Sequence, residues 1–342
     1  MERGVLELRF HPFDLPLKHP FAISRGTADV QPTLIVELSD GVHRGFGEAT
    51  SNPYYGVTIA GMQAAIERID ETLRKYDGDD PTTFFRQIEP QLADAPFALC
   101  AVDMAVHDLW GKRNKAPVYR LWGYELPQSP LSSFTIGIDD VETMIMKLHE
   151  EPDWPIYKVK LGTDHDLDII RRLREHTEAP FRVDANCAWS VAETVEKAGQ
   201  LKRLGVEFIE QPLPADDREG QREVYRRSPL PLMADESCLA EPDVAKCQGL
   251  FHGVNVKLVK CGGLTPARRM LQEARQLGLK TMVGCMTESS VGISAAAQLL
   301  PLLDYVDIDG AELLAKDVAR GVRVERGRCR YPDAYGNGVS LI

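Results

Sequence analysis

The sequence predicts an α/β protein, a modified (β/α)8 barrel of the TIM type joined to an α+β capping domain. Its second half carries five polar residues at intervals of 24, 26, 25 and 22 residues, about the length of one strand plus one helix. These residues are Lys160, Asp184, Glu210, Asp235 and Lys257. The first third of the chain lacks this rhythm, and a length of 342 residues suits a barrel with an accessory lobe.

The capping domain is assigned to residues 1–125, and the end of the chain, about 315–342, is expected to return to it. Alternating apolar and polar residues predict strands, and apolar residues three and four apart predict helices. The strands are expected at 5–10, 33–38 and 44–48, and the helices at 58–76, 81–92 and 97–115. Two stretches rich in Gly, Ser, Pro and Tyr, 21–28 and 50–58, are predicted to be loops that reach over the barrel mouth.

The barrel is assigned to residues 126–314, where short apolar runs alternate with helical patterns. Strands are expected near 132–137, 156–161, 181–184, 206–210, 231–235, 253–258, 280–285 and 304–309. Eight strands with covering helices favour a closed barrel over an open sheet. The polar, turn-rich tail from residue 321 predicts a return strand to the capping domain instead of a last barrel helix.

Composition argues against several classes of function. A net charge of −11 and a pI near 5.3 disfavour a nucleic-acid partner. No apolar window reaches the length of a membrane span, and the N-terminal MERGVLELRF reads as a strand without an apolar signal core. The seven cysteines form no CxxC pair and are expected to be reduced thiols. We therefore expect a cytoplasmic protein with a small-molecule substrate and no membrane partner, as a monomer or a homo-oligomer.

The alternation of side chains along a strand places the five polar residues on the inner face or at the mouth of the barrel. In residues 157–161, Lys158 and Lys160 share one face and apolar residues occupy the other. Lys257 is opposed to apolar neighbours in the same way. One carboxylate at a strand end is often a helix N-cap, but five polar residues in phase on consecutive strands disfavour that alternative.

The three carboxylates of this set, Asp184, Glu210 and Asp235, would repel one another unless a cation neutralised them. An oxygen-only set without His or Cys favours one Mg²⁺ per subunit over Zn²⁺. Such an ion would hold a substrate carboxylate and stabilise the enolate that forms when the neighbouring carbon loses its proton. Nearby cations and partial burial favour the neutral form of an amine, so a lysine on each side of the substrate can remove and return the proton with inversion.

The motifs KVKLG, VDANCAW, IEQPL, MADES and VNVKLVKCGGL resemble the enolase superfamily, in particular its muconate-lactonizing-enzyme subgroup. The resemblance includes the segment DMAVHDLWGK and spans nearly the whole chain. It implies Mg²⁺ ligation by the three carboxylates, an acid/base pair of Lys160 and Lys257, and contact of Lys158 with the substrate carboxylate. Lys260 is a weaker candidate base, because its parity places it with the apolar face. No His stands at a catalytic-base position on the sixth or seventh strand, which disfavours the mandelate-racemase branch.

The segment VDIDGAELL at the eighth strand places Asp307 and Asp309 on one face at the mouth. A carboxylate pair suits a free α-ammonium group, and this Asp-x-Asp is similar to that of the dipeptide epimerases. The resemblance implies inversion of the C-terminal residue of a dipeptide, such as L-Ala-L/D-Glu or another L-Ala-Xaa, by two-base 1,1-proton transfer. The alternatives are an N-succinylamino acid racemase or o-succinylbenzoate synthase and, more remotely, an inactive binding protein. The two aspartates could also simply cap the next segment.

Four more residues are expected to line the substrate pocket. Arg25, in PFAISRGT, resembles the arginine that meets a glutamate side chain in L-Ala-D/L-Glu epimerases, although it could instead order its loop. Thr135, Cys285 and Met286 match pocket positions of that family. The aromatic segment SNPYYG could narrow the pocket and favour small or apolar side chains.

Overall fold

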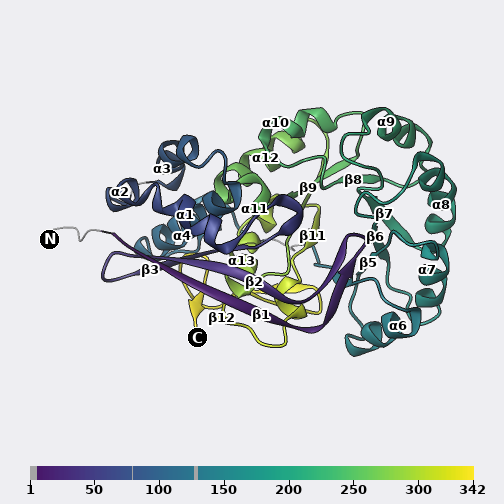
Figure 1. Ribbon diagram of the computed structural model, residues 1–342, viewed down its shortest axis with the longest axis horizontal. Coiled ribbons are helices and arrows are strands. Elements are labelled where there is room, and N and C mark those ends of the chain that lie inside the picture. The colour runs from purple at the N-terminus through teal and green to yellow at the C-terminus, as the bar shows by residue number, and fades with distance from the viewer. Residues whose placement is uncertain (1–5, 79, 127–129) are drawn as a thin grey trace.

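A ring of eight parallel strands forms one end of the molecule, and an antiparallel sheet with helices forms the other (Figure 1). The computed structural model describes residues 6–78, 80–126 and 130–342. Each strand of the ring is hydrogen-bonded to the next in chain order. A parallel bridge between Ser132 and Val306 brings the first and last strands together. The predicted barrel with a capping lobe is therefore confirmed.

The barrel strands agree with the predicted positions, and most are shorter than expected. They are β4 (Phe134–Ile136), β5 (Tyr157–Lys160), β6 (Phe181–Asp184), β7 (Val206–Glu210), β8 (Leu232–Ala234), β9 (Gly253–Lys257), β10 (Lys280–Gly284) and β11 (Tyr305–Asp307). Val159, Val183 and Val256 are fully buried in the main hydrophobic core, as the alternation predicts. Inside the barrel, Phe208 and Met282 form a small apolar cluster with Met233.

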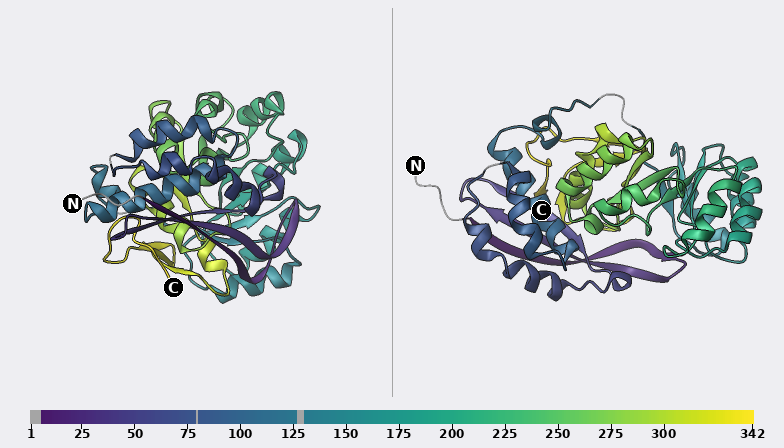
Figure 2. Two further views of the ribbon diagram at one scale, coloured as in Figure 1. Left: turned by 60° about the vertical axis from the view of Figure 1, so that its left-hand side comes forward. Right: turned by 90° about the horizontal axis from the view of Figure 1, so that it is seen from above.

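Helices surround these strands on the outside (Figure 2). They are α6 (Val141–Glu150), α7 (Asp166–Arg174), α8 (Val191–Arg203), α9 (Arg218–Arg227), α10 (Glu241–Val244), α11 (Leu258–Cys261), α12 (Leu264–Gln276) and α13 (Ser290–Ala297). Local sequence explains where they begin: at α8, Ser190 and Glu193 form a reciprocal capping box. No helix in the described part of the chain has the length and apolar character needed to cross a membrane.

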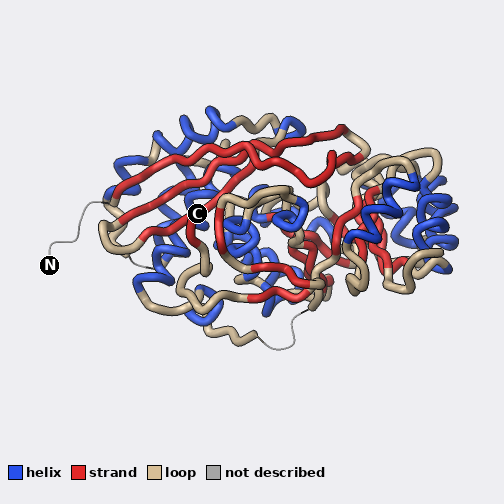
Figure 3. Tube along the Cα trace, turned by 90° about the horizontal axis from the view of Figure 1, so that it is seen from below, coloured by secondary structure: helices blue, strands red, loops and turns tan. Residues whose placement is uncertain are grey.

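The capping sheet consists of β1 (Glu7–Ile23), β2 (Gly26–Ser39) and β3 (Arg44–Thr50), with β1 at one edge. Its strands run from the capping helices toward the barrel (Figure 3). The prediction of a loop at 21–28 was wrong, because these residues form the tip of a long β1–β2 hairpin. Pro12, Pro16 and Pro20 conceal the strand in the sequence, but an edge strand tolerates residues that cannot donate a hydrogen bond. Of the strand predicted at 5–10, Val5 lies outside the described residues.

The capping helices are α1 (Ile59–Glu67), α2 (Asp70–Arg74), α3 (Pro81–Ile88), α4 (Pro96–Arg113) and α5 (Val118–Leu121). The prediction of a single helix at 58–76 was wrong, because α1 ends at Glu67 and α2 begins at Asp70. Asp70 and Glu71 supply negative charge to the first turn of a second helix. The helix predicted at 81–92 becomes a 3₁₀ turn from Glu89, since Pro90 cannot continue an α-helix. The helix predicted at 97–115 is confirmed as α4.

Glycines allow β3 to pack closely on α4. A Cβ added to Gly47 would lie 1.9 Å from the carbonyl oxygen of Ala101. We expect Gly47→Ala to lower the free energy of unfolding by about 1–3 kcal/mol, because the strand and helix would have to move apart. Gly199→Ala, within α8 and with only Arg203 Nη1 at 4.0 Å, is the matched control and should be neutral or slightly stabilising. Urea denaturation measures both; equal stability of the two variants would contradict this packing.

The tail returns to the capping lobe, as predicted, but it does not join the three-stranded sheet. It forms two small antiparallel pairs: β12 (Ala319–Arg320) with β15 (Ser340–Leu341), and β13 (Arg323–Glu325) with β14 (Arg328–Arg330). Lys112 Nζ of α4 donates to the carbonyl oxygen of Val339 at 2.9 Å, and the Asn337 amide donates to Asp108 Oδ1 at 2.7 Å. These contacts support, as a proposal, a capping domain of 1–125 with 315–342 and a barrel domain of 126–314.

Candidate active site

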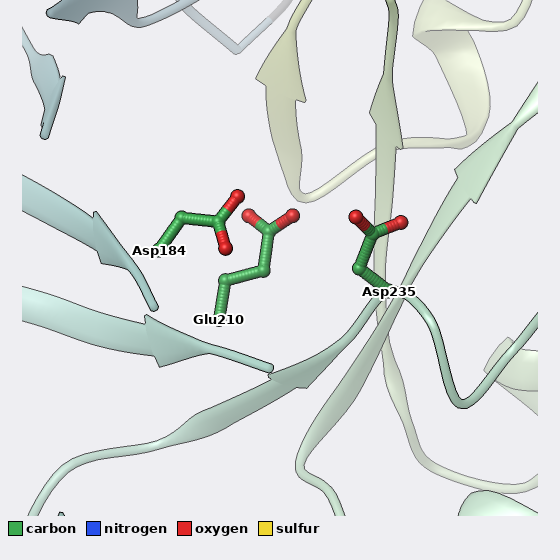
Figure 4. A group of neighbouring side chains, drawn as sticks. All are labelled: Asp184, Glu210 and Asp235. Atoms are coloured by element: carbon green, nitrogen blue, oxygen red, sulfur yellow. The ribbon is translucent and has the colours of Figure 1, made fainter. Parts of the chain in front are cut away.

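Three buried carboxylates meet where consecutive barrel strands end. Asp184 ends β6, Glu210 ends β7, and Asp235 directly follows β8. Asp184 and Glu210 are register partners in the parallel sheet, so their side chains emerge side by side. One oxygen from each of the three groups lies within 4.8 Å of the others, and Figure 4 shows the carboxylates turned toward a common space. The period of the sequence thus brings its acidic residues together.

Four buried lysines contact these carboxylates, and three of them, Lys158, Lys160 and Lys257, lie on barrel strands. Lys158 Nζ lies 2.9 Å from Glu210 Oε2, 3.2 Å from Asp184 Oδ2 and 2.7 Å from Asp307 Oδ2. Lys160 Nζ lies 2.7 Å from Asp184 Oδ2, and Lys257 Nζ lies 3.1 Å from Asp235 Oδ2. Since β5 and β9 are four strands apart in a ring of eight, Lys160 and Lys257 stand on opposite sides of the barrel.

Burial and ion pairing pull the pKa values of these groups in different directions. Burial raises the pKa of Asp184 and Asp235, but the adjacent lysines outweigh it and leave both pKa values below their ordinary range. Burial and the charge of Asp184 raise the pKa of Glu210 to about 7. Burial lowers the pKa of Lys257, yet the charge of Asp235 leaves it raised. Ammonium and carboxylate groups therefore neutralise one another in this network.

The donor set fits a hard divalent cation. All three acidic groups offer oxygen, and none is more than 2% exposed. Glu210 Oε2 accepts no well-aligned hydrogen bond, although Lys158 Nζ lies 2.9 Å away. Such a buried oxygen retains a lone pair for another cation. A donor set made only of oxygen atoms suits Mg²⁺ better than Zn²⁺.

A second acidic pair lies across the mouth, at the end of β11. Asp307 accepts from Ser133 Oγ at 2.7 Å and pairs with Lys158. Asp309 accepts from the amide and the hydroxyl of Thr135 at 2.5 and 3.1 Å. Burial and the neighbouring Asp307 raise the pKa of Asp309 to about 7. Among the described residues Asp309 has no cationic partner, so this carboxyl group can take up an external ammonium group.

A cavity of about 310 Å³ opens above these groups, with the tip of the β1–β2 hairpin in its wall. Met286 lines it, and so does Cys285, whose thiol has its pKa raised well above the ordinary value by burial. Arg25 Nη1 in the hairpin tip lies 2.7 Å from Glu236 Oε1. Burial lowers the pKa of Arg25, but the pairing with Glu236 outweighs it and the pKa is raised. The structure thus brings all twelve predicted residues to this end of the barrel.

Sequence reasoning missed Glu236 and Asn255, and it ranked Lys260 only as a weaker candidate base. Glu236 follows Asp235 directly, and strand parity would have turned it outward, but the chain has already left β8 at that point. Lys260 Nζ donates to the carbonyl oxygen of Asp235 at 2.7 Å and also to its carboxylate. Strand parity does not apply to Lys260, because β9 ends at Lys257 and Lys260 lies on α11. Asn255 Nδ2 donates to Glu210 Oε1 at 2.8 Å; its alternation with Lys257 was the available signal.

Comparison with known proteins covers nearly the whole chain. Residues 7–123 match the mandelate racemase / muconate lactonizing enzyme N-terminal domain, and residues 142–342 match the enolase C-terminal domain-like family. The chain is 52% identical to the L-Ala-D/L-amino acid epimerase of Flavobacterium johnsoniae, over 98% of this chain and 100% of that protein. It is 36% identical to the L-Ala-D/L-Glu epimerase of Bacteroides thetaiotaomicron, over 99% and 89%.

Among solved structures, the dipeptide epimerase of Enterococcus faecalis V583, complexed with Mg and the dipeptide L-Leu-L-Tyr, superposes with a TM-score of 0.92. The two chains are 29% identical, and the match covers 99% of this chain and 100% of that one. Both the fold and the order of elements are therefore shared along the full length.

Proposed function

This chain belongs to the mandelate racemase / muconate lactonizing enzyme family of the enolase superfamily, and we propose that it is a Mg²⁺-dependent dipeptide epimerase. It inverts the α-carbon of the C-terminal residue of a dipeptide by two-base 1,1-proton transfer. The main support for this proposal is that Lys160 and Lys257 lie on opposite sides of the barrel, with the three carboxylates between them. Inversion needs a proton removed from one face of a carbon and delivered to the other.

The two ends of the site suit the two charged ends of a dipeptide. Glu210 on β7 and Asp307 on β11 belong to strands four apart in the ring, hence to opposite sides of the mouth. The substrate carboxylate goes to the Asp184, Glu210 and Asp235 side, and the α-ammonium group goes to Asp309. This orientation leaves the α-carbon of the C-terminal residue between the two lysines. Thr135 holds Asp309 in place, and Lys158 adds positive charge beside the substrate carboxylate.

Asp184, Glu210 and Asp235 would hold the Mg²⁺. When bound, the ion supplies Lewis-acid stabilisation for the negative charge that develops on the substrate carboxylate. Lys160 and Lys257 would stand on either side of the α-carbon, so that the neutral lysine accepts the α-proton on one face while the protonated lysine donates a proton on the other. These side chains are buried, which makes their electrostatic interactions stronger than they would be in water.

A substrate library tests the proposal directly. The purified protein is incubated with L,L dipeptides and with N-succinylamino acids in deuterated water containing Mg²⁺, and α-deuterium incorporation is read by mass spectrometry. Deuterium at the C-terminal residue of free dipeptides, with formation of the L,D product, is the expected result. Turnover only of N-succinylamino acids would favour a racemase on the same fold, and no exchange in any substrate would favour a binding protein.

Asp309→Asn should weaken the use of free dipeptides severely. The substitution keeps the shape of the side chain but removes the charge that pairs with the α-ammonium group. Losing one partner of a buried charge pair typically costs about 2–5 kcal/mol, which corresponds to roughly 30-fold to several thousandfold in kcat/KM. Acylated analogues, which lack the ammonium group, should be spared or improved. The measurement is kcat/KM for L-Ala-Xaa dipeptides and their N-acyl counterparts with both proteins.

Asp168→Asn on α7 is the control for the loss of an aspartate charge, since its side chain is 70% exposed and pairs with Arg171 of the same helix. It should leave both substrate classes unaffected. If wild-type protein turns over N-succinylamino acids faster than any free dipeptide, the assignment of Asp309 to an ammonium group is wrong.

A further inference from the structure

We propose that Glu236 determines the side-chain specificity of this pocket by neutralising Arg25, so that the pocket prefers dipeptides whose epimerised residue carries an uncharged side chain. The inference rests on the proposed epimerase function and names its substrate class more closely. It concerns the ion pair between Arg25, in the tip of the β1–β2 hairpin, and Glu236, in the segment that follows β8 at the barrel mouth. Neither residue belongs to the carboxylate set that would hold the metal.

Glu236 is built into the barrel and not free to leave it. Its side chain is 2% exposed, and it lies directly after Asp235 at the end of β8. Oε1 lies 2.7 Å from Arg25 Nη1 and accepts from Asn186 Nδ2 at 3.4 Å. Oε2 is buried and accepts no hydrogen bond. The guanidinium of Arg25 is therefore the main compensation for a buried negative charge.

Arg25 in turn is fixed by contacts from three parts of the mouth. Besides Glu236, its Nη1 donates to the carbonyl oxygen of Asn186 at 3.4 Å. Its guanidinium carbon stacks 4.1 Å from the ring centroid of Tyr54, a geometry that stabilises a cation over an aromatic face. Ser24, next in the tip, donates to the same Asn186 carbonyl at 3.3 Å. These contacts hold the hairpin tip over the cavity and leave the positive charge already paired.

A substrate with a glutamate side chain would meet this pair unfavourably. Its carboxylate would compete with Glu236 for one guanidinium, close to a second buried acid, Asp235, and like charges in a buried site repel. If Arg25 turned to the substrate, Glu236 would remain buried without its partner, a loss worth at least about tenfold in binding. An amide or apolar side chain leaves the pair intact and contacts the cavity wall, which includes Tyr54, Tyr55 and Met286.

The experiment compares two substrates of nearly the same size, L-Ala-L-Gln and L-Ala-L-Glu, with the full-length protein and Mg²⁺. The readout is the ratio of their kcat/KM values for α-deuterium exchange. A ratio within one protein cancels any loss of metal affinity or folded fraction that affects both substrates. We expect wild-type protein to favour L-Ala-L-Gln by at least about tenfold.

Glu236→Gln should free the charge of Arg25 and lower this ratio by about tenfold or more, in favour of L-Ala-L-Glu. Arg25→Met should raise the ratio, because Glu236 then faces the substrate without compensation. The double variant Arg25→Met/Glu236→Gln should lack the gain for L-Ala-L-Glu, since no cation remains to be freed. If Glu236→Gln does not fold, Arg25→Met alone decides between the outcomes.

Two results would overturn the inference while leaving the proposed function in place. One is a wild-type protein that uses L-Ala-L-Glu as well as L-Ala-L-Gln; the other is an unchanged ratio in Glu236→Gln or, failing that variant, in Arg25→Met. A wild-type protein that exchanges no dipeptide with any side chain would instead overturn the proposed function, and the inference with it.

Discussion

Lys160→Ala and Lys257→Ala are each expected to abolish epimerase turnover, with a loss of about 10²–10⁴-fold or more in kcat. Each lysine serves one face of the α-carbon, so inversion cannot be completed when either is missing. The remaining lysine still reaches its own face, and one epimer of the substrate should continue to exchange its α-proton with solvent. Chiral chromatography measures inversion, and mass spectrometry in deuterated water measures exchange, for the L,L and L,D substrates separately.

Lys280→Ala is the matched control for this pair. Lys280 also lies on a barrel strand, but at the start of β10, where its side chain is 58% exposed and pairs with Asp304. Removing a surface ion pair of this kind changes stability by about 0–1 kcal/mol and should leave activity intact. Circular dichroism and Mg²⁺ titration should show that all three variants remain folded and bind the ion. Full epimerisation by either active-site variant would exclude the two-base mechanism.

The barrel and its acidic residues could be predicted from the sequence, because both follow from local periodicity. A repeat of about 25 residues fixes which strands neighbour one another, and parity fixes which side chains point inward. Asp184, Glu210 and Asp235 therefore converge whatever the details of the loops. The same reasoning placed Asp307 and Asp309 at the mouth, and the structure shows that both accept hydrogen bonds from Thr135 there.

The hairpin that closes the mouth could not be predicted in the same way. Its prolines and its glycine-containing tip are typical of loops, and its strand pairing is decided by the edge position of β1 in the folded sheet. The pairing of Arg25 with Glu236 joins residues far apart in the chain and depends on where that tip lies. Of the two sequence-based interpretations of Arg25, a contact with a substrate carboxylate stays a prediction, while the ordering of its own segment agrees with these contacts.

The pairing of lysines with carboxylates inside the site could not be predicted from the sequence either. The contact of Lys158 with a substrate carboxylate stays a prediction, but the position of its Nζ among Asp184, Glu210 and Asp307 was not expected. Which ammonium group contacts which carboxylate depends on side-chain rotamers, and alternation along a strand does not specify these. Lys260 shows the same limit, because its contact with Asp235 follows from the turn into α11 and not from strand parity.

Removal of the divalent ion with EDTA is expected to abolish activity, and Mg²⁺ or Mn²⁺ should restore it better than Zn²⁺. The oxygen-only set of Asp184, Glu210 and Asp235 favours hard cations. Without the ion, no Lewis acid is left to stabilise the negative charge that develops on the substrate carboxylate. The measurements are activity after metal removal, verified by elemental analysis, and recovery on titration with each ion.

Glu210→Gln separates loss of the ion from loss of the lysines, since it leaves both lysines in place and weakens the donor set. It should raise the Mg²⁺ concentration needed for half-maximal activity and reduce the increase in Tm that Mg²⁺ gives, because an ion that binds only the folded protein stabilises it. Glu219→Gln on α9, with a side chain 89% exposed, is the control and should behave as wild type. The two lysines alone offer no group to stabilise the charge that builds up on the substrate carboxylate, so turnover is expected to need the ion. Undiminished turnover by verified metal-free protein would rule out the ion, and with it the role of the three carboxylates.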